Sequence, residues 1–205
     1  MDCFALLEEP RRPWLDPEPL RQNYLSRSAA THPDHFHSAA AETRDEASAA
    51  TAALNTAYNK LRETRDRLAH LLELELGRRP AEIQAVPPGV SDLFFQVAKA
   101  CQEADRCIAD RAAITSPLLK VQMFERSLSV AERVSEVQSK VGQGLAALEV
   151  VLKSLNESWE NAPAIGSPGR AESLPLGQLE EVYRAVSYLA RWRAQLQERF
   201  VQLSM

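Results

Sequence analysis

Hydrophobic residues recur along this chain with the three- and four-residue spacing of amphipathic helices. The first such stretch is short, from Asp2 to Glu9, and Pro10 ends it. A second begins after Asp16, a favourable N-cap with Pro17 at the first helical position, and runs to about Thr31. Its apolar side consists of Leu20, Tyr24 and Leu25. The pattern therefore predicts two helices of unequal length at the start of the chain.

A longer amphipathic stretch follows, from about Ser38 to Glu63. Its apolar stripe is rich in alanine, which indicates that a neighbouring helix packs closely against it. The stripe consists of Ala50, Ala53, Leu54, Ala57, Tyr58 and Leu61. The next segment, Asp66 to Leu76, either continues this helix or forms a fourth one, and Gly77 is a natural C-terminal stop.

Beyond this point the pattern changes to a proline-containing linker followed by longer helices. Residues 78–90 form the linker. Ser91 is the predicted cap of a helix from Asp92 to about Ile114, and Ser116 with Pro117 begins a longer one. That longer helix carries a heptad-like seam of Val134, Val137, Val141, Leu145, Leu148, Leu152, Leu155 and Trp159. A second seam contains Leu179, Val182, Val186, Leu189, Leu196, Phe200 and Leu203.

The two seams are separated by residues 161–177, which contain three prolines and three glycines and are long enough to join antiparallel helices. We therefore predict an all-α protein with an N-terminal helical hairpin unit in residues 1–77 and an antiparallel three-helix bundle in residues 91–205. The loop 161–177 is predicted to be flexible. A self-associating coiled coil could use the same seams, but their shortness favours an intramolecular bundle and a monomer.

Composition and charge narrow the classes of function. The formal net charge of −4 disfavours nucleic-acid binding, which needs a basic surface. No stretch approaches the roughly 20 apolar residues that span a bilayer, and Asp2 stands where a secretory signal would be basic. Three cysteines at irregular spacing do not form a disulfide framework, which favours a reducing compartment. We expect a soluble, cytoplasmic protein that binds neither nucleic acid nor membranes.

The turn between the second and third predicted helices carries the tripeptide His32, Pro33 and Asp34. Pro33 ends the preceding helix and stiffens the turn, so the two polar side chains can point outward. Such a rigid polar corner suits docking to a charged groove of another protein. No nucleophile accompanies it, so we expect no enzymatic activity and no cofactor. His35 and His37 lie nearby, but no cysteine or fourth ligand does, so we expect no metal site.

Four blocks of sequence resemble J-domains, and most closely those of the HscB/Jac-type co-chaperones of iron–sulfur cluster assembly. They are Met1 to Leu7 (MDCFALL), His32 to Phe36 (HPDHF), Leu54 to Arg62 (LNTAYNKLR) and Arg67 to Leu74 (RLAHLLEL). Together they cover residues 1 to about 77, so this segment is identified as a J-domain. The block from Leu54 to Arg62 is more specific to this subfamily than the tripeptide is.

The resemblance implies a co-chaperone. In J-domains the His-Pro-Asp turn and a basic face of the preceding helix dock on a DnaK/HscA-type chaperone and trigger its ATP hydrolysis. The chaperone-contacting residues that the resemblance implies are His32, Pro33, Asp34, Arg21, Tyr24 and Arg27.

Residues 91–205 resemble the same family in layout, and there the bundle binds the scaffold protein on which iron–sulfur clusters form. The resemblance implies a client surface on the first helix of the bundle. Its residues are Leu93, Phe94, Phe95 and Val97. Two adjacent phenylalanines cannot both face one core, so we expect one of them to be exposed.

Two alternatives stay open. The second predicted helix has two basic residues, Arg21 and Arg27, and Gln96 and Lys99 stand where the family would carry acids. One alternative is a J-like helical adaptor that oligomerises through its seams and has no chaperone activity. The other is an active J-protein with a different client.

Overall fold

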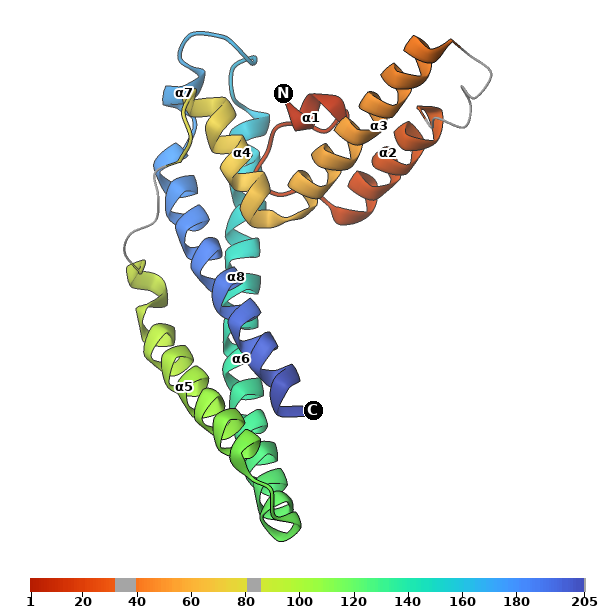
Figure 1. Ribbon diagram of the computed structural model, residues 1–205. Coiled ribbons are helices and arrows are strands. Elements are labelled where there is room, and N and C mark those ends of the chain that lie inside the picture. The colour runs from red at the N-terminus through yellow and green to blue at the C-terminus, as the bar shows by residue number, and fades with distance from the viewer. Residues whose placement is uncertain (32–39, 81–85, 205) are drawn as a thin grey trace. The chain divides into compact units, whose positions relative to one another are not determined.

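The computed structural model describes residues 1–31, 40–80 and 86–204, so the tripeptide at 32–34 lies outside the described residues. Within these ranges the regular structure is helical and contains no strand (Figure 1), which confirms the all-α prediction. The helices are α1 (Cys3–Leu6), α2 (Pro17–Ala30), α3 (Ala41–Arg62), α4 (Thr64–Leu76), α5 (Ser91–Ala113), α6 (Pro117–Glu160), α7 (Arg170–Ser173) and α8 (Leu176–Ser204), with a 3-10 turn η2 (Pro88–Val90).

The predicted helix ends are largely confirmed. The Asp16 side chain accepts a hydrogen bond from the Glu18 N–H at the start of α2. Gly77 ends α4 in the left-handed conformation, with φ of 69°. The prediction for Ser91 is wrong, because Val90 is the N-cap of α5 and the Ser91 hydroxyl instead donates to the Pro87 carbonyl. α1 is also shorter than predicted, since it ends at Leu6.

The structure separates α3 from α4, which the sequence left open. Glu63 between them is extended, with φ of −83° and ψ of 114°. The Arg67 side chain, which is 4% exposed, supports this break. Its guanidinium donates to the Leu61 carbonyl at the end of α3 (2.7 Å) and to the Pro13 carbonyl (3.0 Å). The buried cation thus satisfies the Leu61 carbonyl, which a continuous helix would itself have used.

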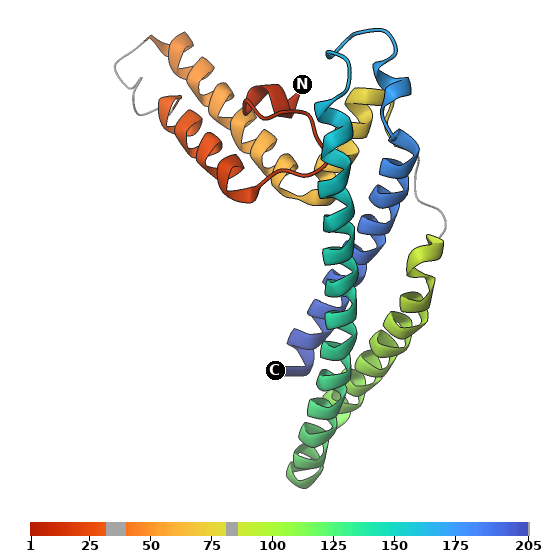
Figure 2. The same ribbon diagram turned by 180° about the vertical axis from the view of Figure 1, so that it is seen from behind.

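The chain forms two compact units, and the first contains Met1–Ala81 and Val151–Tyr183. Its helices α2 and α3 lie side by side and antiparallel (Figures 1 and 2), since Tyr24 bonds Asn55 while the later Thr31 accepts from the earlier Thr51. The buried hydrophobic residues of this unit are Cys3, Phe4, Leu7, Leu15, Leu20, Ala47, Leu54, Ala57, Leu61, Leu68, Leu71, Leu72, Leu152, Leu155, Trp159, Leu174, Leu176, Leu179 and Val182.

Polar contacts connect residues 151–183 to the N-terminal segment within this unit. The Trp14 N–H donates to the Asn156 side-chain oxygen (3.0 Å), and the Asn156 amide donates back to the Trp14 carbonyl (2.9 Å). The Arg170 guanidinium binds both oxygens of Glu75, each at 2.9 Å. Residues 151–183, which belong to the predicted bundle segment, therefore pack with the predicted J-domain segment. The predicted domain boundaries themselves stay a prediction.

The second unit contains Glu82–Val150 and Arg184–Met205. Its helices α5 and α6 run antiparallel, because successive polar pairs join positions that rise by seven in α6 and fall by seven in α5. The pairs are Arg126–Asp110, Arg133–Glu103 and Lys140–Gln96. The core contains Val90, Val97, Ala100, Ala104, Cys107, Met123, Val130, Ala131, Val134, Val141, Ala185, Leu189, Trp192, Leu196 and Leu203.

The sequence predicts no stretch that is long and apolar enough to span a membrane. Among the helices in the described ranges, none combines the length and the apolar character that crossing a membrane requires.

Candidate functional site

Helix α1 is fixed against α4 by a buried histidine. The Cys3 N–H donates to Nε2 of His70 (3.1 Å), and the imidazole stacks on the Phe4 ring with centroids 5.8 Å apart. Burial, helped by the nearby Lys60 cation, lowers the pKa of His70, so the ring is predominantly neutral near pH 7 and can accept this bond. Since Nε2 is the acceptor, the proton of the neutral ring resides on Nδ1.

The N-cap residue of α1, Asp2, is also held by several hydrogen bonds. The Asp2 carboxylate accepts from the Phe4 and Ala5 N–H groups and from the Arg11 guanidinium. Burial acts to raise the pKa of Asp2, but these hydrogen bonds and the Arg11 charge outweigh it, so the pKa lies below its ordinary value. The carboxylate therefore stays ionised at neutral pH and holds α1 in place.

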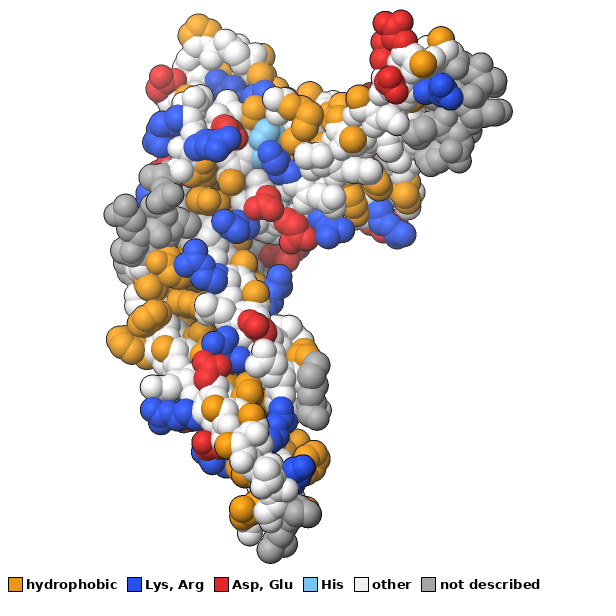
Figure 3. Space-filling model, viewed as in Figure 1, with side chains coloured by type: hydrophobic (Ala, Val, Ile, Leu, Met, Phe, Trp, Pro, Cys, Tyr) orange, Lys and Arg blue, Asp and Glu red, His pale blue; other side chains and the backbone are white. Residues whose placement is uncertain are grey.

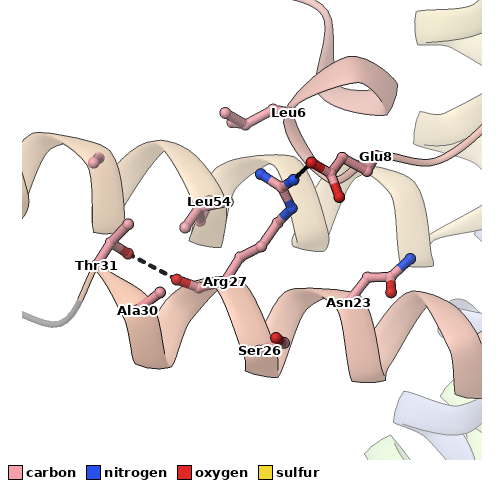
Figure 4. A pocket seen from close by; sticks show the side chains of 9 residues that line it. Leu6, Glu8, Asn23, Ser26, Arg27, Ala30, Thr31 and Leu54 are labelled. Carbon is pink, nitrogen blue, oxygen red and sulfur yellow. Dashed lines mark hydrogen bonds and ion pairs between the residues drawn. The ribbon is translucent and has the colours of Figure 1, made fainter.

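A groove of about 440 Å³ opens between α1, α2 and α3 (Figure 4). Leu6, Ala50 and Leu54 provide apolar lining, and Arg27 forms an ion pair with Glu8. The Arg27 side chain is 31% exposed, so it remains accessible while it is paired. The sequence pattern points to Arg27 but not to Glu8, because Glu8 lies outside any periodic pattern.

The other two α2 residues assigned to chaperone contact differ in how they are held. The Tyr24 hydroxyl donates to the Asn55 side-chain oxygen (2.6 Å), and its ring stacks on Tyr58 with centroids 4.3 Å apart. Arg21 is exposed. The helical hairpin therefore presents one exposed cation, one paired cation and one aromatic ring held by stacking and a hydrogen bond. His32, Pro33 and Asp34 follow α2 in sequence and lie outside the described residues.

The first helix of the second unit carries an exposed aromatic pair. Phe94 is 41% and Phe95 74% exposed, so both side chains reach solvent, whereas the sequence predicted exposure for one of them. Their rings meet edge-on with centroids 5.4 Å apart, and Phe94 leans on Trp192 at 6.3 Å. Hydrophobic side chains gather over the beginning of α5 in Figure 3. Phe94 is at the margin of the core because the large Trp192 ring occupies the interior position beside it.

The other two residues assigned to client contact face inward. Val97 is 2% exposed and belongs to the core, and the partly buried Leu93 packs against that core. Val97 is therefore a packing residue and is not included in the proposed surface. Its burial follows from helix geometry, because it points about 160° away from Phe95, two residues earlier.

Cations accompany the aromatic pair. Lys99 follows Phe95 by one helical turn and is exposed. Lys140 of α6 donates to the Gln96 side chain (2.8 Å), and Arg191 lies 5.7 Å from the ring of Tyr188, which contacts Trp192. Lys140 and Arg191 could not be predicted from the sequence near Phe94 and Phe95, because they lie far along the chain from this pair. Across the described ranges, no group of three or more metal-binding side chains comes together.

The arrangement of helices defines an all-α protein with the fold of the HscB co-chaperones. The chain superposes on the crystal structure of the human co-chaperone protein HscB with a TM-score of 0.62 and 15% identity, covering 97% of this chain and 81% of that one. It superposes on chaperone HscB from Vibrio cholerae with a TM-score of 0.56 and 19% identity, covering 99% of each. The predicted resemblance is thus confirmed at the level of the fold.

Comparisons based on sequence add nothing to this. No protein-family model matches the chain, and no curated protein does.

Proposed function

We propose that this protein is a co-chaperone that stimulates the ATPase of a DnaK/HscA-type chaperone. The supporting observation is the likeness of fold to HscB structures over almost the whole chain. The tripeptide His32-Pro33-Asp34 follows directly after α2, and Arg21, Tyr24 and Arg27 lie on that helix. In this proposal the cations attract the chaperone, Tyr24 provides a fixed contact, and the protein itself catalyses no reaction.

The test replaces His32 with Gln and measures the rate of ATP hydrolysis by a purified DnaK/HscA-type chaperone. We expect the wild-type chain to raise that rate and the His32→Gln variant to lose the effect. His35→Gln is the matched control, because it removes a neighbouring histidine and should leave stimulation intact. Equal stimulation by His32→Gln and by the wild type would disprove the proposed role of the tripeptide.

We further propose that the aromatic pair Phe94 and Phe95 contacts the client and that this client is the iron–sulfur scaffold protein. Support comes from the exposure of both rings and from the likeness to the HscB fold. An exposed aromatic pair loses little conformational freedom when it binds, which suits it to be an anchor. The proposal also places the protein in the cytoplasm as a monomer.

The client is tested by binding of the purified scaffold protein to the full chain. Phe95→Ala should weaken binding by at least about tenfold if the ring is an anchor. Phe124→Ala, which changes another phenylalanine with 70% exposure, is the control and should bind like the wild type. If the wild-type chain binds no scaffold but still stimulates the chaperone, the client part of the proposal fails and the co-chaperone part stands.

A further inference from the structure

One side of α6 continues its contact pattern beyond the end of α8. Leu145, Gln138, Ala131 and Phe124 follow at seven-residue intervals and therefore lie near one line along the helix. Along this line Gln138 bonds Gln197 of α8 (3.1 Å), and Ala131 is buried in the shared core. Phe124, one heptad earlier, is 70% exposed.

The last turns of α8 lie beside this side of α6. There the Arg111 guanidinium from α5 donates to the carbonyls of Gln202 (2.6 Å) and Leu203 (3.2 Å). α6 begins well beyond this point (Figures 1 and 2). Val121 and Leu128 on the same side are 62% and 55% exposed. An apolar stripe thus continues the α6–α8 seam where α8 no longer covers it.

Beside the stripe lies a groove of about 510 Å³ between α6 and the last turns of α8. Leu128, Ala131 and Phe200 are among its lining residues, together with the carboxylates of Glu132 and Glu136. The arginines of this part of α6 are engaged elsewhere, because Arg126 and Arg133 pair with acids of α5. Lys120 lies at the far end of the stripe, away from the groove. The groove therefore carries negative charge.

We propose that the exposed stripe of Val121, Phe124 and Leu128, together with the adjoining α6–α8 groove and its residues Phe200, Glu132 and Glu136, binds an amphipathic helix of another protein with a basic flank. The occupant is a helix because the exposed stripe continues a seam that a helix already fills. Its flank is basic because two carboxylates border the apolar surface. The site is independent of the proposed chaperone and client contacts, neither of which uses these residues.

The test uses two synthetic helical peptides with the same leucine seam, one flanked by lysines and one by glutamates. Each is labelled and titrated with the full-length protein while fluorescence anisotropy is recorded. We expect the lysine-flanked peptide to bind about tenfold more tightly or better. Phe124→Glu with Leu128→Glu should abolish this binding. Phe95→Glu, which changes an exposed phenylalanine on α5, should not.

Charge is tested separately with Glu132→Lys and Glu136→Lys together, which should invert the preference between the two peptides. Equal binding of both peptides, or binding that survives Phe124→Glu with Leu128→Glu, would overturn the proposal. Sedimentation of the protein alone tests whether a second copy of this chain fills the groove instead. A concentration-dependent dimer that Phe124→Glu removes would show that a second copy fills the groove, and would also overturn it. Circular dichroism confirms that each variant keeps its helical content.

Discussion

The two compact units bury different kinds of polar side chain. Among the described residues of the first, the buried polar or charged residues include Arg67, His70, Asn156 and Arg170. In the described part of the second, the buried polar residues are Ser127 and Ser187, and ion pairs such as Arg126–Asp110 lie on the surface. The difference follows from the irregular, non-helical backbone that the first unit contains. The first unit must hold irregular segments such as residues 10–16 and 161–169, whose backbone groups need partners.

The second unit consists of long helices that satisfy their own backbone and pack through a repeating apolar seam. Such a seam tolerates local change because its stability is shared among many similar contacts. The first unit depends instead on a few specific contacts, each of which leaves a buried group unpaired when it is lost. Substitutions of polar residues should therefore affect the first unit far more than the second.

The largest effect is expected for Arg170→Ala. This change leaves Glu75, whose side chain is 3% exposed, without its bidentate partner. Breaking a buried pair in this way costs about 3 to 5 kcal/mol of the free energy of unfolding. Urea denaturation followed by circular dichroism measures the loss.

Arg126→Ala is the matched control for this prediction. It removes one member of a pair with Asp110 whose side chains are 53% and 51% exposed. The expected cost is below about 1 kcal/mol. Similar losses for the two variants would contradict the contrast between the units.

A smaller loss is expected for Asn156→Ala. This residue is 8% exposed, and its amide serves both the N–H and the carbonyl of Trp14. The loss should be about 1 to 3 kcal/mol, because two backbone groups lose their partner. Asn161→Ala, where the exposed amide donates to Glu157 within one turn, should change the midpoint of unfolding little. A neutral Asn156→Ala would show that the backbone at Trp14 is held by other contacts.

The pH dependence of stability should separate the units as well. Burial lowers the pKa of His70, with Lys60 adding to the shift and the acids Asp2 and Glu73 opposing it. Below about pH 6.5 the unfolded chain binds a proton that the folded chain does not, so the stability of the first unit decreases as the pH falls. His70→Gln should flatten this slope between about pH 7.5 and 5.5, measured by thermal unfolding. His35→Gln should retain it, and an unchanged slope in His70→Gln would refute the assignment.

The smallest effect concerns two glycines of α6 in the second unit. A Cβ atom at Gly142 would meet no atom within 4 Å, so Gly142→Ala should raise the free energy of unfolding by about 0.5 to 1 kcal/mol through helix propensity. At Gly144 the new atom would lie 3.2 Å from Cδ1 of Leu189, which must shift. The gain for Gly144→Ala should be smaller or reversed, and melting temperatures compare the two. Equal gains in stability for Gly142→Ala and Gly144→Ala would mean that the Leu189 side chain shifts without cost.

Periodicity in the sequence was sufficient to predict most of the helices. The spacing of apolar residues located α2, α5, α6 and α8, and the local chemistry of Asp16 and Gly77 located two of their ends. These features are set by neighbours in sequence, which is why they can be read from it. The break at Glu63 was different, because it depends on Arg67 reaching the carbonyls of Leu61 and Pro13.

The candidate surfaces show the same division. The sequence by itself determined that Phe94 and Phe95 could not share one core, and that Arg21, Tyr24 and Arg27 lie on the helix before the tripeptide. Only the tertiary structure decided that Glu8 pairs with Arg27, that Trp192 keeps Phe94 at the margin of the core, and that Arg111 binds the last turn of α8. Helix periodicity depends on residues three and four positions apart, whereas these contacts join residues 19 to 98 positions apart that meet only after the helices pack.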